Sequence, residues 1–176
     1  ALGWWRGVPG GAEWLDRLPE IVEERARAWG LAVLEPLSGG NVSLVVAVER
    51  RGEPAVLKVN FPEPESECEP DALRLWSGAG AVRLLEYDEP TRSLLLERCF
   101  PGERLWDVED DEEATGIAAQ ILATLWRPPP AGHRFPSLVD VARRWSLEIP
   151  RDWAALGRVF ENDLVDEAVS TCLELG

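Results

Sequence analysis

The sequence is poor in the residues that bind zinc. Its 176 residues include three cysteines, Cys68, Cys99 and Cys172, at wide spacing and without a CxxC motif, and a single histidine, His133. Zinc sites need clustered cysteine and histidine side chains. We therefore expect no zinc site, and we expect all three cysteines to be buried or half-buried thiols that behave as small hydrophobic residues.

Long apolar segments and basic clusters are also absent. No apolar run approaches the roughly 18 residues of a membrane span, and no basic leader precedes an apolar segment, which predicts neither a span nor a signal peptide and favours a cytoplasmic location. The formal net charge is −14, from 32 acidic and 18 basic residues, and no basic patch is longer than Arg50-Arg51 or Arg143-Arg144. Nucleic acid and anionic membranes are therefore not expected as partners, whereas a cationic small molecule suits an acidic chain.

What is present predicts an α+β fold in two lobes. Turn residues and β-branched runs predict five antiparallel strands in the first hundred residues, with one helix before the sheet and one within it. The predicted strands are 31–37, 42–48, 55–59, 81–87 and 93–98, and the predicted helices are 12–29, 69–78, 112–126, 138–145 and 154–175. We expect a sheet lobe over residues 1–98 and the start of a helical lobe over 99–176, with a cleft between them.

Lys58 lies among apolar residues in the third predicted strand. Burying an ammonium group is unfavourable unless it meets an anion. The turn formed by Ser38, Gly39, Gly40 and Asn41 precedes the neighbouring strand, and its backbone N–H groups can cradle oxygen atoms. A phosphate held between this turn and Lys58 would explain both features, and the alternative is an edge-strand lysine that points to water.

Glu69 is the predicted partner of Lys58. It recurs with Leu73 and Trp76 at helical spacing, so its side chain belongs to the face that packs against the sheet, where a carboxylate needs a cation. The alternative is that Glu69 only caps the helix N-terminus. The start of this helix is also open, because Ser66 and Glu69 have the spacing of a capping box, whereas Pro70 suits the first turn of a helix that begins at Glu69.

Together these features resemble the small lobe of the protein-kinase-like fold. Four stretches, 69–85, 93–98, 101–105 and 138–145, are similar in the same order to the aminoglycoside and hydroxyurea phosphotransferase family, which includes streptomycin kinases. The resemblance covers nearly the whole chain. It implies an enzyme that uses ATP and Mg²⁺ to transfer a phosphoryl group to a hydroxyl of an aminoglycoside-type antibiotic, or to hydroxyurea, and so gives resistance.

The resemblance also implies roles for particular residues. Lys58 would bind the α- and β-phosphates of the nucleotide, and Glu69 would position Lys58. The remaining nucleotide-binding residues would be the turn over the phosphates and the hinge whose backbone reads the adenine; they are Ser38, Gly39, Gly40 and Asn41 in the turn, and Glu97, Arg98 and Cys99 in the hinge.

The chain departs from the family pattern in its turn and in its catalytic loop. The turn lacks the full GxGxxG spacing. The family's His-Gly-Asp segment, its following asparagine and its later metal-binding aspartate have no counterpart, because His133 is not followed by Gly-Asp and is predicted to be a loop residue. We therefore expect the chain to stop before its catalytic base and to be inactive alone.

A chain that stops there would leave part of its last helix uncovered. We expect self-association through the face of Leu164, Ala168 and Cys172. Two alternatives remain open. One is a catalytically dead kinase-like module that binds nucleotide or a protein partner, and the other is an acidic interaction domain with no nucleotide site.

Overall fold

The computed structural model describes residues 2–38 and 42–175, apart from the side chain of Glu65, and forms two compact units, residues 1–128 and 129–176. Each unit is described by itself. The division between these units falls after Pro128, whereas the lobe boundary predicted from the sequence falls after Arg98. The predicted boundary concerns a hinge for ligand binding, and it stays a prediction.

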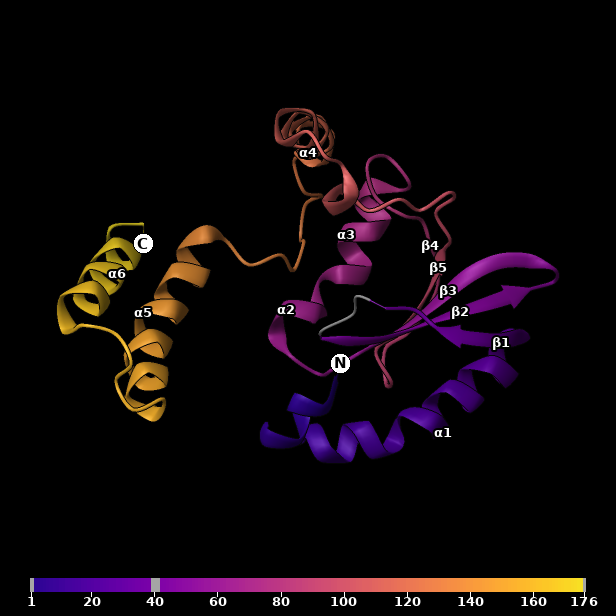
Figure 1. The fold of residues 1–176 in the computed structure, drawn as a ribbon, viewed down its shortest axis with the longest axis horizontal. Coiled ribbons are helices and arrows are strands. Elements are labelled where there is room, and N and C mark those ends of the chain that lie inside the picture. The colour runs from indigo at the N-terminus through magenta and orange to yellow at the C-terminus, as the bar shows by residue number, and fades with distance from the viewer. Residues whose placement is uncertain (1, 39–41, 176) are drawn as a thin grey trace. The chain divides into compact units, whose positions relative to one another are not determined.

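The first unit contains the sheet and the helices that cover it (Figure 1). In chain order its elements are η1 (Leu2–Gly7), α1 (Gly11–Trp29), β1 (Leu31–Pro36), β2 (Ser43–Arg50), β3 (Glu53–Asn60), α2 (Pro64–Glu67), α3 (Glu69–Trp76), β4 (Leu84–Asp88), β5 (Ser93–Glu97), η2 (Leu105–Asp107) and α4 (Asp111–Leu125). The predicted α+β class is confirmed. The fourth strand begins at Leu84, so the prediction of strand from residue 81 is wrong at its start.

All five strands pair antiparallel in the order β1-β2-β3-β5-β4, which places β3 between two neighbours. In the β2–β3 register Ser43 lies opposite Asn60 and Val45 lies opposite Lys58. Successive side chains of a strand point to opposite faces, so Val56, Lys58 and Asn60 share one face of β3.

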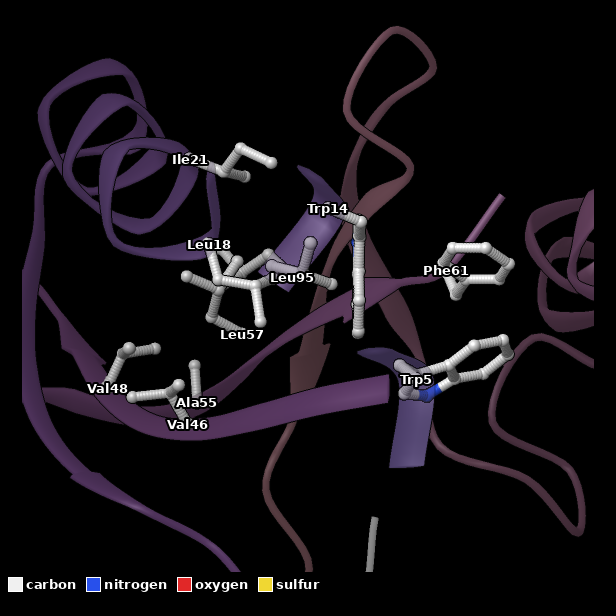
Figure 2. Packing of buried hydrophobic residues seen from close by; sticks show 11 residues of the cluster. Trp5, Trp14, Leu18, Ile21, Val46, Val48, Ala55, Leu57, Phe61 and Leu95 are labelled. Carbon is white, nitrogen blue, oxygen red and sulfur yellow. The ribbon is translucent and has the colours of Figure 1, made fainter. Parts of the chain in front are cut away.

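The other face of β3 packs against η1 and α1. Leu57 and Val59 are fully buried there, among side chains of the adjacent strands and of α1. Figure 2 shows this cluster, in which the ring of Trp5 lies 4.0 Å from that of Phe61, centroid to centroid, and Trp14 meets both rings edge-on. The apolar side chains buried on this side stabilise the sheet, and its opposite face is left to α3 and the site.

Helix α3 covers part of that opposite face. Leu73 packs there against Leu94 and Leu96 of β5. The helix begins at Glu69, as one of the two predictions had it, and the capping box is wrong: the Ser66 hydroxyl instead donates to the carbonyl oxygens of Phe61 and Glu63 at 3.0 and 2.9 Å. Those bonds fix the turn that leads the chain from β3 into α3.

The second unit contains two helices, α5 (Leu138–Ala155) and α6 (Asn162–Glu174). The hydroxyl of Ser137 and the carboxylate of Asp140 form a capping box at the start of α5. The prediction of one helix over 154–175 is wrong, because Gly157 and Arg158 adopt positive φ angles of 82° and 59°, which end a right-handed helix.

The face of α6 that was predicted to be exposed, formed by Leu164, Ala168 and Cys172, is only partly exposed. Cys172 is buried at 7% exposure, whereas Leu164 is 57% exposed. Self-association therefore stays a prediction, and it now rests on Leu164 rather than on Cys172. In the part of the chain that the structure describes, no helix is long and apolar enough to cross a membrane.

The cysteines differ in exposure. Cys68 is half-buried and Cys172 is buried, as predicted. Cys99 is exposed, so the prediction for this residue is wrong; it follows β5 in an irregular segment where no packed element covers it.

Candidate functional site

Lys58 and Glu69 form an ion pair on the α3 side of the sheet. The Lys58 Nζ and Glu69 Oε1 atoms are 2.5 Å apart, and the two side chains are 24% and 25% exposed. The predicted pairing is confirmed. The edge-strand alternative is wrong because β3 has a neighbour on each side. The alternative that Glu69 only caps the helix N-terminus is also wrong, because its carboxylate pairs with Lys58 of the sheet.

A second donor holds the other oxygen of Glu69. Asn60 Nδ2 donates to Glu69 Oε2 at 2.6 Å, and the Ser43 hydroxyl donates to Asn60 Oδ1 at 2.6 Å. Asn60 and Ser43 are each only 3% exposed. Sequence reasoning missed both residues, although the period of two in β3 places Asn60 on the face of Lys58 and the strand register places Ser43 opposite it.

A pocket of about 380 Å³ lies beside this network. Lys58, Glu69, Asn60 and Ser43 line it, together with residues of α3 and of the segment that leads into it; the latter are Val42, Glu63, Ser66, Cys68, Ala72 and Trp76. The wall of the pocket carries the only lysine of the sequence, Lys58, together with two carboxylates, Glu63 and Glu69, next to apolar groups.

A second pocket, of about 440 Å³, lies at the end of β5. Its wall includes the apolar side chains of Val45, Val56, Val82 and Leu96 and also the predicted site residues Ser38, Glu97, Arg98 and Cys99. The structure thus brings four predicted residues to one pocket. Gly39, Gly40 and Asn41 lie outside the described residues.

The side chain of Glu97 is engaged by Arg83. The Arg83 side chain donates to it at 2.6 Å and the Arg83 backbone N–H donates at 2.8 Å, and these hydrogen bonds hold the pKa of the Glu97 carboxyl below its usual value. The backbone N–H of Glu97 in turn donates to the Arg83 carbonyl at 3.0 Å. Within the part of the chain that the structure describes, the N–H of Cys99 donates no backbone hydrogen bond.

His133 belongs to the second unit and is an exposed loop residue, as predicted. Its Nδ1 accepts a hydrogen bond from the backbone N–H of Phe135 at 3.1 Å. Among the described residues no group of three or more His, Cys, Asp or Glu side chains is arranged to hold a metal ion.

A five-stranded antiparallel sheet with a lysine on its central strand and a glutamate on the packed helix is the arrangement of a kinase-like small lobe. The chain belongs to the aminoglycoside/hydroxyurea antibiotic resistance kinase family, whose sequence profile matches residues 29–171.

Two relatives of the chain are, by name, a phosphotransferase and a kinase. The chain is 43% identical to hydroxyurea phosphotransferase of Kitasatospora aureofaciens over 173 residues, which cover 96% of the chain and 50% of the relative. It is 38% identical to streptomycin 6-kinase of Streptomyces glaucescens over 167 residues, which cover 94% of the chain and 54% of the relative. The chain therefore spans about half the length of these curated relatives.

Proposed function

We propose that the sheet unit binds ATP and serves an antibiotic phosphotransferase, which transfers the γ-phosphoryl group to a hydroxyl of an aminoglycoside-type antibiotic or to hydroxyurea. The observation that carries this proposal is the Lys58–Glu69 ion pair beside a pocket on the α3 side of the sheet. The names of the two relatives, a streptomycin kinase and a hydroxyurea phosphotransferase, support the choice of acceptor.

The spacing of the two pockets fits a nucleotide. Val56, in the wall of the second pocket, and Lys58, in the wall of the first, are two residues apart on one face of β3. Two residues of a strand span about 6.6 Å, a separation that a ribose bridges. The base would lie between the apolar side chains near Val56, with the backbone of Glu97 to Cys99 at its edge, and the phosphates would lie at Lys58.

In the proposed site Lys58 would bind the phosphates and Glu69 would position Lys58. The ammonium group of Lys58 is a point charge with three N–H donors for phosphate oxygens. Glu69 keeps that group above the pocket rather than extended into water, so that it meets the phosphate without reorganisation. ATP itself supplies the phosphoryl group. We assign no ligand for Mg²⁺ to this chain, because its described residues offer no suitable cluster.

The acceptor side of the proposal depends on charge. The chain carries a net charge of −14, and a strongly acidic protein attracts a polycationic aminoglycoside over several ångströms. We expect the rate of association with such a drug to fall as salt is added, because screening shortens the reach of these charges.

The nucleotide site can be tested on one amino group, because Lys58 is the only lysine in the 176 residues. An amine-directed reagent followed by peptide mass spectrometry reports Lys58 separately from the α-amino group. We expect ATP to protect Lys58 from the reagent, adenosine to protect it less, and Lys58→Met to weaken ATP binding measured by calorimetry.

Arg50→Gln is the matched control for Lys58→Met. It removes the same unit of charge from β2, at the end of the strand far from Ser43, where Arg50 pairs with Glu86 at 2.8 Å. Unchanged ATP affinity in Lys58→Met, or equal losses in both variants, would refute the nucleotide site. Mass spectrometry of streptomycin and hydroxyurea incubated with protein and ATP tests the transfer: a phosphorylated product supports it, and binding without product favours a nucleotide-binding module.

A further inference from the structure

We propose that Asn60 is a positioning residue that holds the Glu69 carboxylate in the orientation required to direct Lys58 at a phosphate. This inference rests on the proposed nucleotide site, and its tests include one that needs no nucleotide. Asn60 touches neither the expected base nor the expected phosphates; it acts through Glu69.

The contact geometry gives each oxygen of Glu69 a separate donor. Oε1 accepts from Lys58 at 2.5 Å and Oε2 accepts from Asn60 at 2.6 Å. The terminal torsion of a glutamate is broad, so an ion pair alone leaves the carboxylate free to turn. With Oε2 fixed by Asn60, Oε1 is the oxygen left for Lys58.

Asn60 is itself fixed from the opposite side. A carboxylate only accepts hydrogen bonds, so the amide nitrogen of Asn60 must face Glu69 and its carbonyl oxygen must face the Ser43 hydroxyl. The backbone N–H of Asn60 donates to the Arg92 carbonyl at 3.2 Å. An amide that is only 3% exposed is stabilised there because these partners satisfy it.

This arrangement separates two links between β3 and α3. The Lys58 ammonium has three N–H donors, so a phosphate can accept from those that do not point at Glu69, and it does not compete for the Asn60 amide. Glu69 and the start of α3 therefore keep their position on the sheet when a phosphate binds at Lys58. The sequence shows a cation and an acid; the structure adds the group that holds the acid in place.

Asn60→Asp is the sharpest test because it keeps the shape and replaces the donor by an acceptor. Two carboxylates at hydrogen-bonding distance do not both stay ionised, so one takes up a proton as the pH falls. At high pH, we expect the variant to bind ATP about tenfold more weakly than wild type, which corresponds to bound ATP raising the pKa of the two adjacent carboxyls by about one unit. In mild acid, where one of these carboxyls is protonated, we expect the affinity of the variant to approach that of wild type.

The ATP affinity of the variant is divided by that of wild type at each pH. The titration of the nucleotide itself affects both affinities equally and cancels in this ratio. The other titratable groups in the wall of this pocket, Lys58, Glu63 and Cys68, are common to both proteins. A ratio that does not change with pH would overturn the proposal.

Asn60→Leu separates positioning from stability. This variant keeps a similar volume and removes the donor, so we expect weaker binding of ATP and ADP and unchanged binding of adenosine, which has no phosphate. Asp88→Asn is the control: it breaks the ion pair between Asp88 and Arg25, which joins β4 to α1, and should lower stability with no change in the ratio of ATP to adenosine affinity. Equal losses for ATP and adenosine in Asn60→Leu would mean that Asn60 is only structural.

A measurement without nucleotide distinguishes failure of this inference from failure of the proposed function. With ¹⁵N-lysine the protein gives one side-chain ammonium signal, from Lys58. We expect that signal to be sharp and protected from solvent exchange in wild type, and broadened with faster exchange in Asn60→Leu. An identical signal in both proteins overturns the positioning role, whereas a changed signal in a protein that binds no ATP leaves the positioning intact and refutes only the nucleotide site.

Discussion

Replacement of Glu69 by alanine and by glutamine should have very different effects on stability. Glu69→Ala removes both acceptors, so the Asn60 amide nitrogen and the Lys58 ammonium group lose the hydrogen bonds that they donate to Glu69. Glu69→Gln keeps one acceptor for Lys58. If the Asn60 amide turns over, its carbonyl accepts from the new glutamine amide and its nitrogen donates to the Ser43 hydroxyl, so every buried group keeps a partner.

The size of the stability loss in Glu69→Ala follows from how exposed the Asn60 amide nitrogen and the Lys58 ammonium group are. The Asn60 amide is 3% exposed, so leaving its donor unsatisfied costs about 1 to 3 kcal/mol. The Lys58 side chain is 24% exposed and can extend into water, so the lost ion pair adds no more than about 1 kcal/mol. We expect Glu69→Ala to lower the free energy of unfolding of the sheet unit by about 2 to 4 kcal/mol, and Glu69→Gln to lower it by less than about 1 kcal/mol.

Amide hydrogen exchange of β3 in increasing urea measures this loss in the sheet unit alone, which matters because the chain has two compact units and a single unfolding curve mixes them. Equal losses in Glu69→Ala and Glu69→Gln would refute the reasoning, because the charge and not the buried amide would then dominate. Combining Asn60→Leu with Glu69→Ala is a further check. The double variant should lose less unfolding free energy than the sum of the two single losses. The reason is that Asn60→Leu has already removed the donor that Glu69→Ala leaves without an acceptor.

The remaining predictions concern pH, the core and the second unit. The pKa of Glu97 is lowered by Arg83, so this carboxylate stabilises the fold above its unfolded pKa and the contribution is lost as the pH falls through the lower folded pKa; Glu97→Gln should therefore reduce stability at pH 7 and reduce it progressively less as the pH is lowered, as urea unfolding across a pH series will show. Leu57→Ala should cost about 2 to 5 kcal/mol in thermal or urea unfolding, because Leu57 is fully buried, whereas Leu147→Ala, at a residue 77% exposed, should change stability little. Ser137→Ala removes the capping box of α5 and should reduce helix content measured by circular dichroism at 222 nm.

The sheet and the ion pair were predictable because each has a strong local signal. The β-branched runs and turn residues predicted five strands, and a single lysine among apolar residues required an anion. Glu69 followed from helical spacing. These inferences need only the periods of strands and helices, which the sequence displays directly.

Asn60 and Ser43 were not predicted because their importance depends on register. A polar residue at the end of a strand is ordinary, and only the pairing of Ser43 opposite Asn60 makes the two side chains meet. The end of α5 was missed for a related reason: the apolar spacing continues through residues 156–161, while the positive φ angles of Gly157 and Arg158 are decided by local backbone conformation. Pro150 lies inside α5, although a proline in the sequence suggests a break.

The strand order has a consequence for biosynthesis. β3 pairs with β5, so the strand that carries Lys58 gains its second neighbour only after the chain has passed through α3 and β4. During translation the ion pair can form before residue 93 leaves the ribosome, but the second pocket cannot, because Leu96 in its wall belongs to β5. The proposed nucleotide site is therefore expected to be completed in one late step rather than gradually, since the long-range pairing of β3 with β5 must come first.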